Sequence, residues 1–386
     1  MKSSNNKGIT LIALVITIIV LMILTGVAIA LITGEEGILS RANESTIRYG
    51  EKQEEENGII KSYEDIYDRY ESGKIAALPS GWDSSKVTPV YDTESKDYVV
   101  PIPKDFYYVG GTRDTGIVIS DNVADKDKGD SHEVAQTLEG NQFVWIPIDN
   151  IDEIYDSNKK QGKDYMFTAE GKAVESGTYT IRYVTGDWPG AVYLDSDPAN
   201  LQEAGSTATT KEQFRDELQE GLDKSISSIA RYKGYYVGRY ETGNLSQSKV
   251  VVKAKNTDII KGWYTKYRLQ KEMYKDKASV NTVMINGCHW DGMLKFINTN
   301  NSIYGNFIYN NRYTGTGNHT GTKVPTGSKA TYKTNNIYDI DGNAAEATTT
   351  RAGSEHNGSF GESGEAPQNL RAISEEGSRI VMHIAE

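Results

Sequence analysis

The chain of 386 residues has very little cysteine and less positive than negative charge. Cys288 is its single cysteine, so no disulfide can form within the chain. An exported domain of this composition must therefore be stabilised by its hydrophobic core or by bound ions. The 42 lysines and arginines are outnumbered by 53 acidic residues, which gives a net charge of −11. Because nucleic-acid binding needs clustered positive charge, we expect no nucleic-acid partner.

Sequence motifs of common catalytic centres are lacking too. No Gly-x-Ser-x-Gly nucleophile elbow occurs, and no glycine-rich phosphate loop ends in Lys-Ser or Lys-Thr. The five histidines have no metal-ligand spacing, and we expect each to be structural or solvated. They are His132, His289, His319, His356 and His383.

The chain contains enough apolar residues to form a packed core, and it is rich in tyrosine. Hydrophobic residues make up 37% of the chain, and its length favours two or three structural units. Tyrosine contributes 25 residues against 7 phenylalanines and 5 tryptophans. Most tyrosines are expected in the core, but the pairing of an apolar ring with a hydroxyl also suits hydrated binding surfaces.

Residues 9–33 form one long uncharged run, ITLIALVITIIVLMILTGVAIALIT. As a helix, these residues would rise about 37 Å, enough to cross a hydrocarbon core of about 30 Å. Lys2 and Lys7 precede the run, while Glu35 and Glu36 follow it. By the positive-inside tendency, we expect a single-pass membrane protein with a cytoplasmic N-terminus and an exported C-terminal part.

The start of the chain resembles the leader of type IV pilins and pseudopilins: Lys7-Gly8 is followed by ITLIALVITIIVLMILTGVAI. The resemblance implies a prepilin leader at residues 1–8, cut after Gly8 by a prepilin peptidase, with methylation of the new N-terminus at Ile9. It also implies pilin subunits as partners. The family usually has glutamate at the fifth mature position, where this chain has Ala13. An unpaired amine in an apolar filament core is costly, so we expect a tip or minor subunit, or a plain membrane anchor of pilin descent.

After the apolar run we expect a helical stem at residues 34–73, because Ile59, Ile60, Tyr63, Ile66, Tyr67 and Tyr70 recur at helical spacing. Gly73, Pro79, Gly81 and Pro89 mark a linker at 74–96. Short strand-like runs dominate residues 97–386, among them FVWIPI at 143–148 and YYVGRY at 235–240. Residues 214–222 and 290–297 are expected as short helices. Asn298 to Lys329 is expected as a long polar loop.

Six strings in this region, in order, resemble the formylglycine-generating, sulfatase-modifying family: GNQFVWIPI, YKGYYVGRYETG, VMINGCHWDGMLKFI, NNIYDIDGNAAEAT, RAGS and LRAISEEGSRIV. The resemblance implies an α+β fold of the C-type-lectin-like kind, with long loops and few regular elements. The enzymes of that family bind copper through a cysteine pair near the C-terminus. This chain has no cysteine after Cys288. We therefore expect a binding protein and no enzyme.

The string YDIDGNAAE carries the metal-site prediction. In the resembling family this turn binds calcium, which implies ligands at Asp339, Gly342, Ala344 and Glu346. The residues themselves favour the same metal, because carboxylate and amide oxygens crowd around a glycine turn as a hard cation prefers. The alternative is an ordinary Asp-Gly turn with solvated carboxylates.

The predicted ligand surface combines the loop at 298–329 with the segment from residue 344 to residue 371, which is polar and rich in glycine. NAAEAT has alanines where relatives commonly carry tryptophans, which opens space for a ligand or marks a variable surface. Variable proteins of diversity-generating retroelements resemble this C-terminal layout. The predicted ligand-binding residues are Ala345, Ala347, Arg351, Ser354, His356, Asn357 and Arg371. Structural salt bridges are an equal alternative for the two arginines.

The sequence thus favours a surface-displayed, pilin-like adhesin or receptor that binds an extracellular protein or glycan. The alternatives are a structural minor pilin or pseudopilin of a secretion or uptake filament, a retroelement-diversified binding protein, and an enzyme that uses the same fold without copper.

Overall fold

The chain divides into two compact units, residues 1–76 and 77–386, in the computed structural model. The structure describes residues 16–25, 79–91, 99–158, 161–167, 173–179, 198–259, 262–300, 318, 322–340, 342–344, 346–349 and 377–386.

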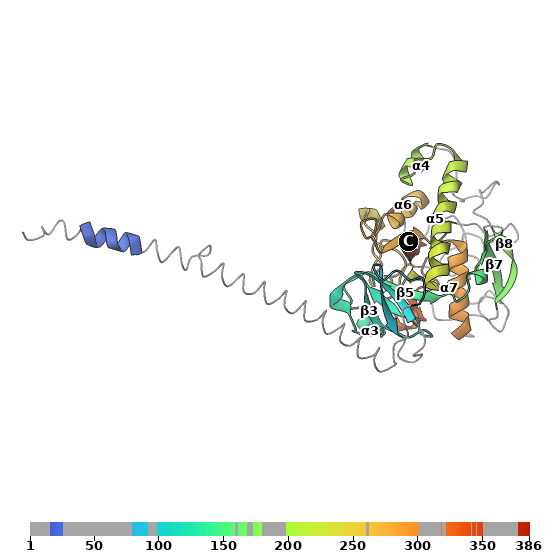
Figure 1. Ribbon diagram of the computed structural model, residues 1–386, viewed down its shortest axis with the longest axis horizontal. Helices are drawn as coiled ribbons and strands as arrows, with labels where there is room; N and C mark the ends of the chain where they lie inside the picture. The colour runs from blue at the N-terminus through green and yellow to red at the C-terminus, as the bar shows by residue number, and fades with distance from the viewer. Residues whose placement is uncertain are drawn as a thin grey trace, which may run out of the picture. The chain divides into compact units, whose positions relative to one another are not determined.

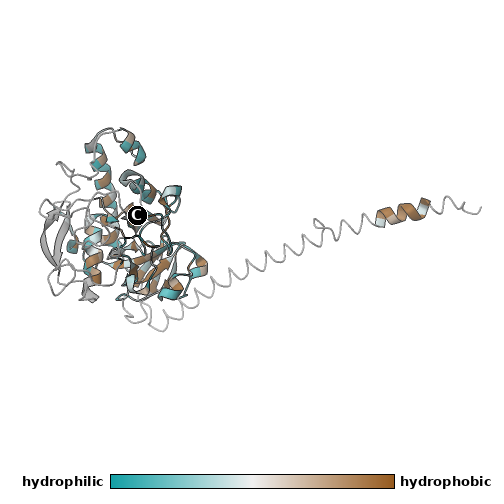
Figure 2. Cartoon of the chain, turned by 180° about the vertical axis from the view of Figure 1, so that it is seen from behind, coloured by the Kyte–Doolittle hydropathy of each residue, from teal (hydrophilic) through white to brown (hydrophobic). Residues whose placement is uncertain are grey.

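In the first unit, residues 16–25 form a helix inside the predicted apolar span. Its large side chains are exposed on all sides, from 43% at Ile18 to 69% at Met22, and Figure 2 shows it as a continuous hydrophobic segment. Among the described residues, no helix is both long and apolar enough to span a bilayer. The rest of the predicted span, the cleavage position Gly8–Ile9 and the predicted stem at 34–73 lie outside the described residues.

The second unit is a mixed α+β structure, which confirms the coarse fold class. Its helices are α3 (His132–Ala135), α4 (Pro198–Glu203), α5 (Lys211–Tyr232), α6 (Trp263–Lys271) and α7 (Gly287–Asn300), with 3-10 turns η1 (Val123–Asp125), η2 (Ile151–Glu153), η3 (Leu245–Gln247) and η4 (Ala330–Tyr332). Its longer strands are β1 (Val87–Tyr91), β2 (Val99–Pro103), β3 (Tyr107–Gly110), β4 (Val118–Ser120), β5 (Gln142–Pro147), β7 (Gln161–Phe167), β8 (Ala173–Tyr179), β9 (Gly234–Gly238), β10 (Val280–Met284) and β15 (Ile380–Ile384). Two-residue strands are β6 (Tyr155–Asp156), β11 (Lys333–Thr334), β12 (Ile337–Tyr338), β13 (Glu346–Ala347) and β14 (Gly377–Ser378).

A six-stranded antiparallel sheet forms the centre of this unit, in the order β10-β15-β9-β5-β4-β3. Strand β9 lies in its interior, and all five of its residues are buried. Its two neighbours, β5 and β15, come from positions far apart in the sequence. The last strand of the chain therefore completes the core of the sheet.

The side chains of the sheet alternate between two hydrophobic clusters, as the pleat requires. Val144 and Val237 face the cluster that contains α5 and α7, while Trp145 and Tyr236 face a second cluster on the opposite side. Figure 1 shows α5 and α7 over one face of the sheet, where they contact β9, β15 and β5. The opposite cluster includes side chains of β2 and of the turn after α6. The sheet is thus buried on both faces.

The regular elements expected from the sequence are largely present. Strand β5 matches the run at 143–148, and β9 begins one residue before the run at 235–240 and ends at Gly238. Helix α5 extends beyond the expected 214–222 in both directions, from its N-cap Thr210 to a left-handed C-cap at Lys233. Helix α7 contains the expected 290–297 and continues into the first residues of the predicted loop at 298–329.

The globular unit begins at Ala77, whereas the sequence placed its start at residue 97. Strand β1 lies inside the predicted linker at 74–96 and pairs with β2 over five residues. Pro79, before the strand, and Pro89, in its middle, suggested a break in the chain. An edge strand tolerates proline, because one of its sides needs no ladder hydrogen bond.

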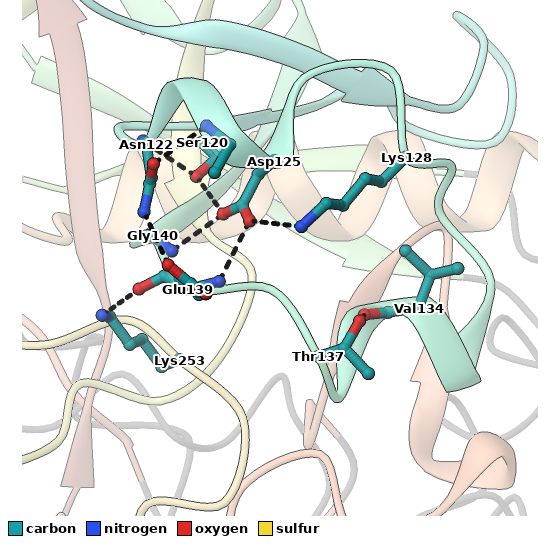
Figure 3. Close-up of polar contacts among 10 residues, drawn as sticks. Ser120, Asn122, Asp125, Lys128, Val134, Thr137, Glu139, Gly140 and Lys253 are labelled. Carbon is teal, nitrogen blue, oxygen red and sulfur yellow. Dashed lines mark hydrogen bonds and ion pairs between the residues drawn. The ribbon is translucent and has the colours of Figure 1, made fainter. Parts of the chain in front are cut away.

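A buried aspartate holds the turn after β4 against the turn before β5 (Figure 3). Asp125 is fully buried, and its Oδ2 accepts hydrogen bonds from the Ser120 hydroxyl at 2.7 Å and the Gly140 N–H at 2.8 Å. Its Oδ1 accepts from the Glu139 N–H at 3.0 Å, with the Lys128 ammonium at 3.6 Å. This carboxylate is fully satisfied, so its role is structural.

Candidate functional site

The predicted calcium turn folds into the interior of the protein. Asp339, Gly342 and Asn343 have φ values of 58°, 94° and 66°, so three residues of this turn take the left-handed conformation. A Cβ at Gly342 would lie 2.4 Å from the Asn318 carbonyl oxygen, which explains glycine at this position. The turn places Asp339 and Glu346 near one another, both nearly inaccessible to solvent.

Glu346 forms a buried bidentate ion pair with Arg379, the residue before β15. The Arg379 Nη2 and Nε groups donate to Glu346 Oε1 and Oε2 at 2.6 and 3.1 Å. Arg379 also donates to the backbone oxygens of Gly238 and Tyr338 at 2.8 and 2.9 Å. Burial raises the pKa of Glu346, and the charge and hydrogen bonds of Arg379 oppose that rise.

Two further carboxylates crowd this pair. Glu241 accepts hydrogen bonds from the Asn343 side-chain amide at 2.6 Å and from the Ala344 N–H at 3.0 Å. Burial raises the pKa of Glu241 well above its ordinary value, and the charges of Asp339 and Glu346 raise it further. We call Glu241, Asp339, Glu346 and Arg379 the carboxylate cluster.

Asp339 is the least satisfied member of the carboxylate cluster. Its Oδ2 accepts from the Gly327 N–H at 2.7 Å, while its Oδ1 is buried without a hydrogen-bond partner among the described residues. Burial raises the pKa of Asp339 to about 7, and the negative charge of Glu346 adds to that rise. Arg379 and the Gly327 N–H act in the opposite direction. A proton or a cation at Oδ1 would satisfy this oxygen.

The carboxylate cluster carries more negative than positive charge. Three carboxylates share one guanidinium, and the next buried cation is Lys266, whose charge lowers the pKa of Glu346. Lys266 donates to the Gly377 carbonyl oxygen at 3.1 Å. The cluster can therefore take up a proton near neutral pH.

The described residues do not complete the predicted calcium site. Both oxygens of Glu346 are used by Arg379, and a guanidinium in this position repels a cation. Calcium takes six to eight oxygen ligands, of which Asp339 Oδ1 supplies one. In the part of the chain that the structure describes, no group of three or more His, Cys, Asp or Glu is placed to hold a metal ion. Asp341 lies outside the described residues, and calcium stays a prediction.

The predicted ligand-binding residues are placed only in part. Ala347 lies in β13 and is fully buried in the cluster beneath α5 and α7, and Ala344 is 3% exposed. These two methyl groups point into the structure. The other predicted ligand residues lie outside the described part of the chain: Ala345, Arg351, Ser354, His356, Asn357 and Arg371.

The connection at 350–376 starts and finishes at one end of the sheet, and the connection at 301–317 finishes there; we call this end the loop end. Asn318 pairs with Gly342, and its side-chain amide donates to Asn343 Oδ1 at 3.1 Å. The Thr349 N–H donates to the Ile285 carbonyl oxygen at 3.0 Å. Strands β13 and β14, which flank the interval 348–376, lie side by side in parallel. The carboxylate cluster lies directly beneath these anchor points.

The opposite end of β15 holds the start of the globular unit, and we call it the attachment end. The Lys86 ammonium donates to the Glu386 carbonyl oxygen at 2.5 Å, and Trp82 packs in one cluster with Ile384. The Trp82 indole N–H donates to the Arg231 carbonyl oxygen at 3.1 Å. Four residue steps along β15 separate the two ends, a distance of about 13 Å.

No protein-family model, curated protein or solved structure matches this chain. The pilin-like and sulfatase-modifying resemblances stay predictions.

Sequence inspection missed Glu241, Lys266 and Arg379 as members of a site. Glu241 and Arg379 lie within strings that carry the resemblance and Lys266 lies between two of them, but nothing in their spacing shows that they meet. Their one signal is composition: a charged residue inside an otherwise apolar strand-like run, as in YYVGRYE and GSRIV, is expected to be paired if buried.

The substitution Asp339→Asn should stabilise the protein by about 1–2 kcal/mol at pH 8, because it removes an incompletely satisfied buried carboxylate beside two others. The folded protein holds a proton on Asp339 up to about pH 7, whereas an unfolded aspartate loses its proton near pH 3.8. Between these values the folded state binds more protons, so wild-type stability falls as pH rises and Asp339→Asn lacks this slope. Urea unfolding at pH 5 and pH 8 with a chelator present measures both effects.

The same variant also tests calcium. If calcium binds, the wild type should melt at a higher temperature with calcium than with chelator, and Asp339→Asn should lose that difference. Lower stability of the variant at pH 8 in chelator would contradict the account of Asp339 as an unsatisfied carboxylate.

Proposed function

We propose that this chain is a surface-displayed binding protein, held in the membrane by a pilin-like N-terminal helix. Its globular unit, of C-type-lectin-like fold, binds an extracellular protein or glycan ligand through the loop end. The separation of the two ends carries this proposal. The unit starts at the attachment end, beside the C-terminal Glu386, whereas the connection at 350–376 is anchored on both sides at the loop end and the connection at 301–317 finishes there.

This polarity is what a displayed receptor needs. A domain joined to the cell at one end presents its opposite end to the surroundings. Recognition residues are commonly placed on loops that a rigid scaffold positions. The scaffold here is the six-stranded sheet, with its interior strand β9 buried on both faces.

The N-terminal helix supports a membrane anchor. A helix that is apolar all round is stable in lipid or in a hydrophobic assembly and unfavourable in water. The side chains of residues 16–25 have this character, and their exposure shows that no described residue covers them. The leader resemblance adds a prepilin peptidase and pilin subunits as partners, and Ala13 favours a place at a filament tip or a single anchored protein.

A binding role is favoured over oxidase chemistry. Cys288 is fully buried in the cluster beneath α5 and α7, and burial raises the pKa of its thiol far above the ordinary value. A buried neutral thiol is a poor metal ligand and a poor nucleophile. The copper-binding pair of the resembling enzymes has no counterpart in the sequence.

Loop replacement on intact cells tests the proposal. Cells displaying the chain are incubated with arrays of glycans and extracellular proteins, and bound cells are counted. Replacing residues 351–371 with a Gly-Ser segment of equal length should abolish capture, because it removes the predicted recognition residues of the loop end. The matched control replaces residues 92–98, which join β1 to β2, and should retain capture.

Cleavage and methylation of the N-terminus are measured on the same cells. Mass spectrometry of the N-terminal peptide should show a chain that begins at a methylated Ile9. Display that stays equal in both replacement variants, with no capture by the wild type on any array, would reject the receptor. A processed chain that cross-links to pilin subunits and captures nothing would instead identify a structural minor pilin.

A further inference from the structure

A groove of about 390 Å³ runs along the edge strand β10, beside helices α5 and α6, which Figure 1 labels. Its volume falls in the range of small-molecule pockets. The groove shares no lining residue with the carboxylate cluster or with the anchor points of the loop end. It is therefore a separate place in which a ligand could bind.

The register between β10 and β15 decides which side chains of the groove share the α5 face of the sheet. Asn281 lies opposite His383, and Val283 lies opposite Val381. Val381 belongs to the hydrophobic cluster that contains α5 and α7, and Val283 packs against that cluster. Because side chains two residues apart on a strand point to the same face, Asn281 and His383 lie on the α5 face too. Asn281, Val283 and His383 therefore form the floor of the groove on this face.

His383 provides an unsatisfied hydrogen-bond acceptor in this floor. It is 2% exposed, and burial lowers its pKa to about 4, so the ring is neutral at physiological pH. Its Nδ1 lies 3.3 Å from the Ile384 carbonyl oxygen, which can only accept, so the proton is assigned to Nδ1 and Nε2 is an acceptor. Nε2 makes no hydrogen bond to a described residue. Because a nearly buried polar atom without a partner is costly, a ligand that donates an N–H or O–H to Nε2 gains that energy.

Helix α5 has a glycine in the lining of the groove that the fold does not require. Gly221 is an interior residue of α5. A Cβ at this position would meet no atom of the described residues within 4 Å. Glycine inside a helix is unfavourable relative to alanine, so neither packing nor helix stability explains its presence. The open space beside its backbone is a slot that a flat ligand can enter.

The wall on the α6 side consists of a tyrosine ring and of charges that compensate one another. Tyr267 belongs to the hydrophobic cluster that contains α5 and α7, and its hydroxyl donates to Glu217 at 3.4 Å. It therefore offers a ligand its ring. Lys271 pairs with Glu217 at 2.6 Å, and Lys224 pairs with Glu220 at 2.7 Å. These paired charges favour neither an anion nor a cation as the ligand.

We infer that this groove binds an uncharged aromatic molecule with a single N–H or O–H donor, of the indole or phenol class. The donor bonds Nε2 of His383, and the aromatic ring lies in the slot beside Gly221 and packs against Tyr267. A sugar fits less well, because it would bring several hydroxyl groups to a floor with one nearly buried unsatisfied acceptor. Lys275, the remaining charge among the described lining residues, is exposed, where solvent and salt screen it. This site is independent of the function proposed above.

Isothermal titration of the purified full chain with indole and with 1-methylindole tests the inference, with the heat of titration into detergent alone subtracted. The two compounds share the same ring system, but 1-methylindole has no N–H donor. Indole should bind at least about tenfold more tightly, because 1-methylindole leaves Nε2 of His383 without a partner. Equal affinity for the two compounds, or no heat with indole, would overturn the inference.

Gly221→Ala separates a binding role of the glycine from a structural one. The added methyl group occupies the slot, so the affinity for indole should fall by at least about tenfold. The melting temperature should nevertheless rise, because alanine is favoured over glycine inside a helix and its Cβ meets no described atom. Asp216→Ala is the control: it changes an exposed residue of α5 outside the groove and should leave the affinity for indole unchanged. Unchanged affinity in Gly221→Ala would also overturn the inference.

Discussion

Replacing Arg379 with methionine should lower the free energy of unfolding by about 3–5 kcal/mol at pH 8, as expected when one partner of a buried ion pair is removed. The guanidinium binds both oxygens of Glu346, and neither side chain is accessible to solvent. Methionine replaces much of the lost volume, so the deficit reports unpaired carboxylates more than a cavity. Urea unfolding followed by tryptophan fluorescence measures it.

The deficit of Arg379→Met should depend on pH. Without the guanidinium, the pKa values of Glu241, Asp339 and Glu346 rise further, because burial then acts with less opposition. The folded variant holds these protons to higher pH than the unfolded chain does. Its stability therefore falls more steeply than that of the wild type as pH rises, and the deficit is smaller at pH 5 than at pH 8.

Arg239→Met is the matched control. Arg239 is equally buried, but it donates to uncharged oxygens: the backbone carbonyls of Asn336 and Asp130 and the side-chain carbonyl of Gln142. Its removal should destabilise the protein without leaving a buried carboxylate unpaired. The loss should thus differ little between pH 5 and pH 8. Parallel pH profiles for the two variants would show that the carboxylate cluster is not the source of the effect.

The parts of the fold that were predictable from the sequence are those whose local pattern agrees with their tertiary setting. Strands β5 and β9 are continuous runs of β-forming residues because both faces of the sheet are covered. Helix α7 has a clear apolar stripe that faces the core. Helix α5 was predicted too short, because Gly221 and the serines at 225, 227 and 228 interrupt the pattern that its buried face continues to Ile229.

The carboxylate cluster was only half predictable. The turn from Asp339 to Glu346 is visible as a glycine turn rich in oxygen donors, which suggested a cation. The sequence does not reveal that Arg379 arrives from the far side of a long connection and takes both oxygens of Glu346. Such a pairing depends on the sheet order β15-β9, a long-range contact without a local signature.

The substitution Asp125→Asn should lower the free energy of unfolding by about 2–3 kcal/mol at pH 7, since it breaks a fully satisfied buried hydrogen-bond network. The two carboxylate oxygens of Asp125 accept from the backbone N–H groups of Glu139 and Gly140 (Figure 3). An asparagine amide can satisfy only one of them, because its NH₂ group then faces the other donor. The measurement is urea unfolding at several pH values.

The pH dependence identifies the charge as the cause. Burial acts to raise the pKa of Asp125, but the hydrogen bonds from Glu139, Ser120 and Gly140 and the charge of Lys128 outweigh it and hold the pKa below its ordinary value. The folded state therefore binds fewer protons than the unfolded chain near pH 3.8. The stabilisation is present above that pH and is lost as pH falls through the folded pKa.

The deficit of Asp125→Asn should accordingly shrink from pH 5 toward pH 2.5, where the wild-type carboxyl also gains a proton. Asp127→Asn provides the control: it makes the same chemical change at an exposed position of the same turn, with a φ of 57° that asparagine readily adopts. It should leave stability within about 0.5 kcal/mol of the wild type. If Asp125→Asn lowers the free energy of unfolding by the same amount over this pH range, the carboxylate charge is not the cause. The loss would then come from the changed shape and hydrogen-bonding pattern of the side chain.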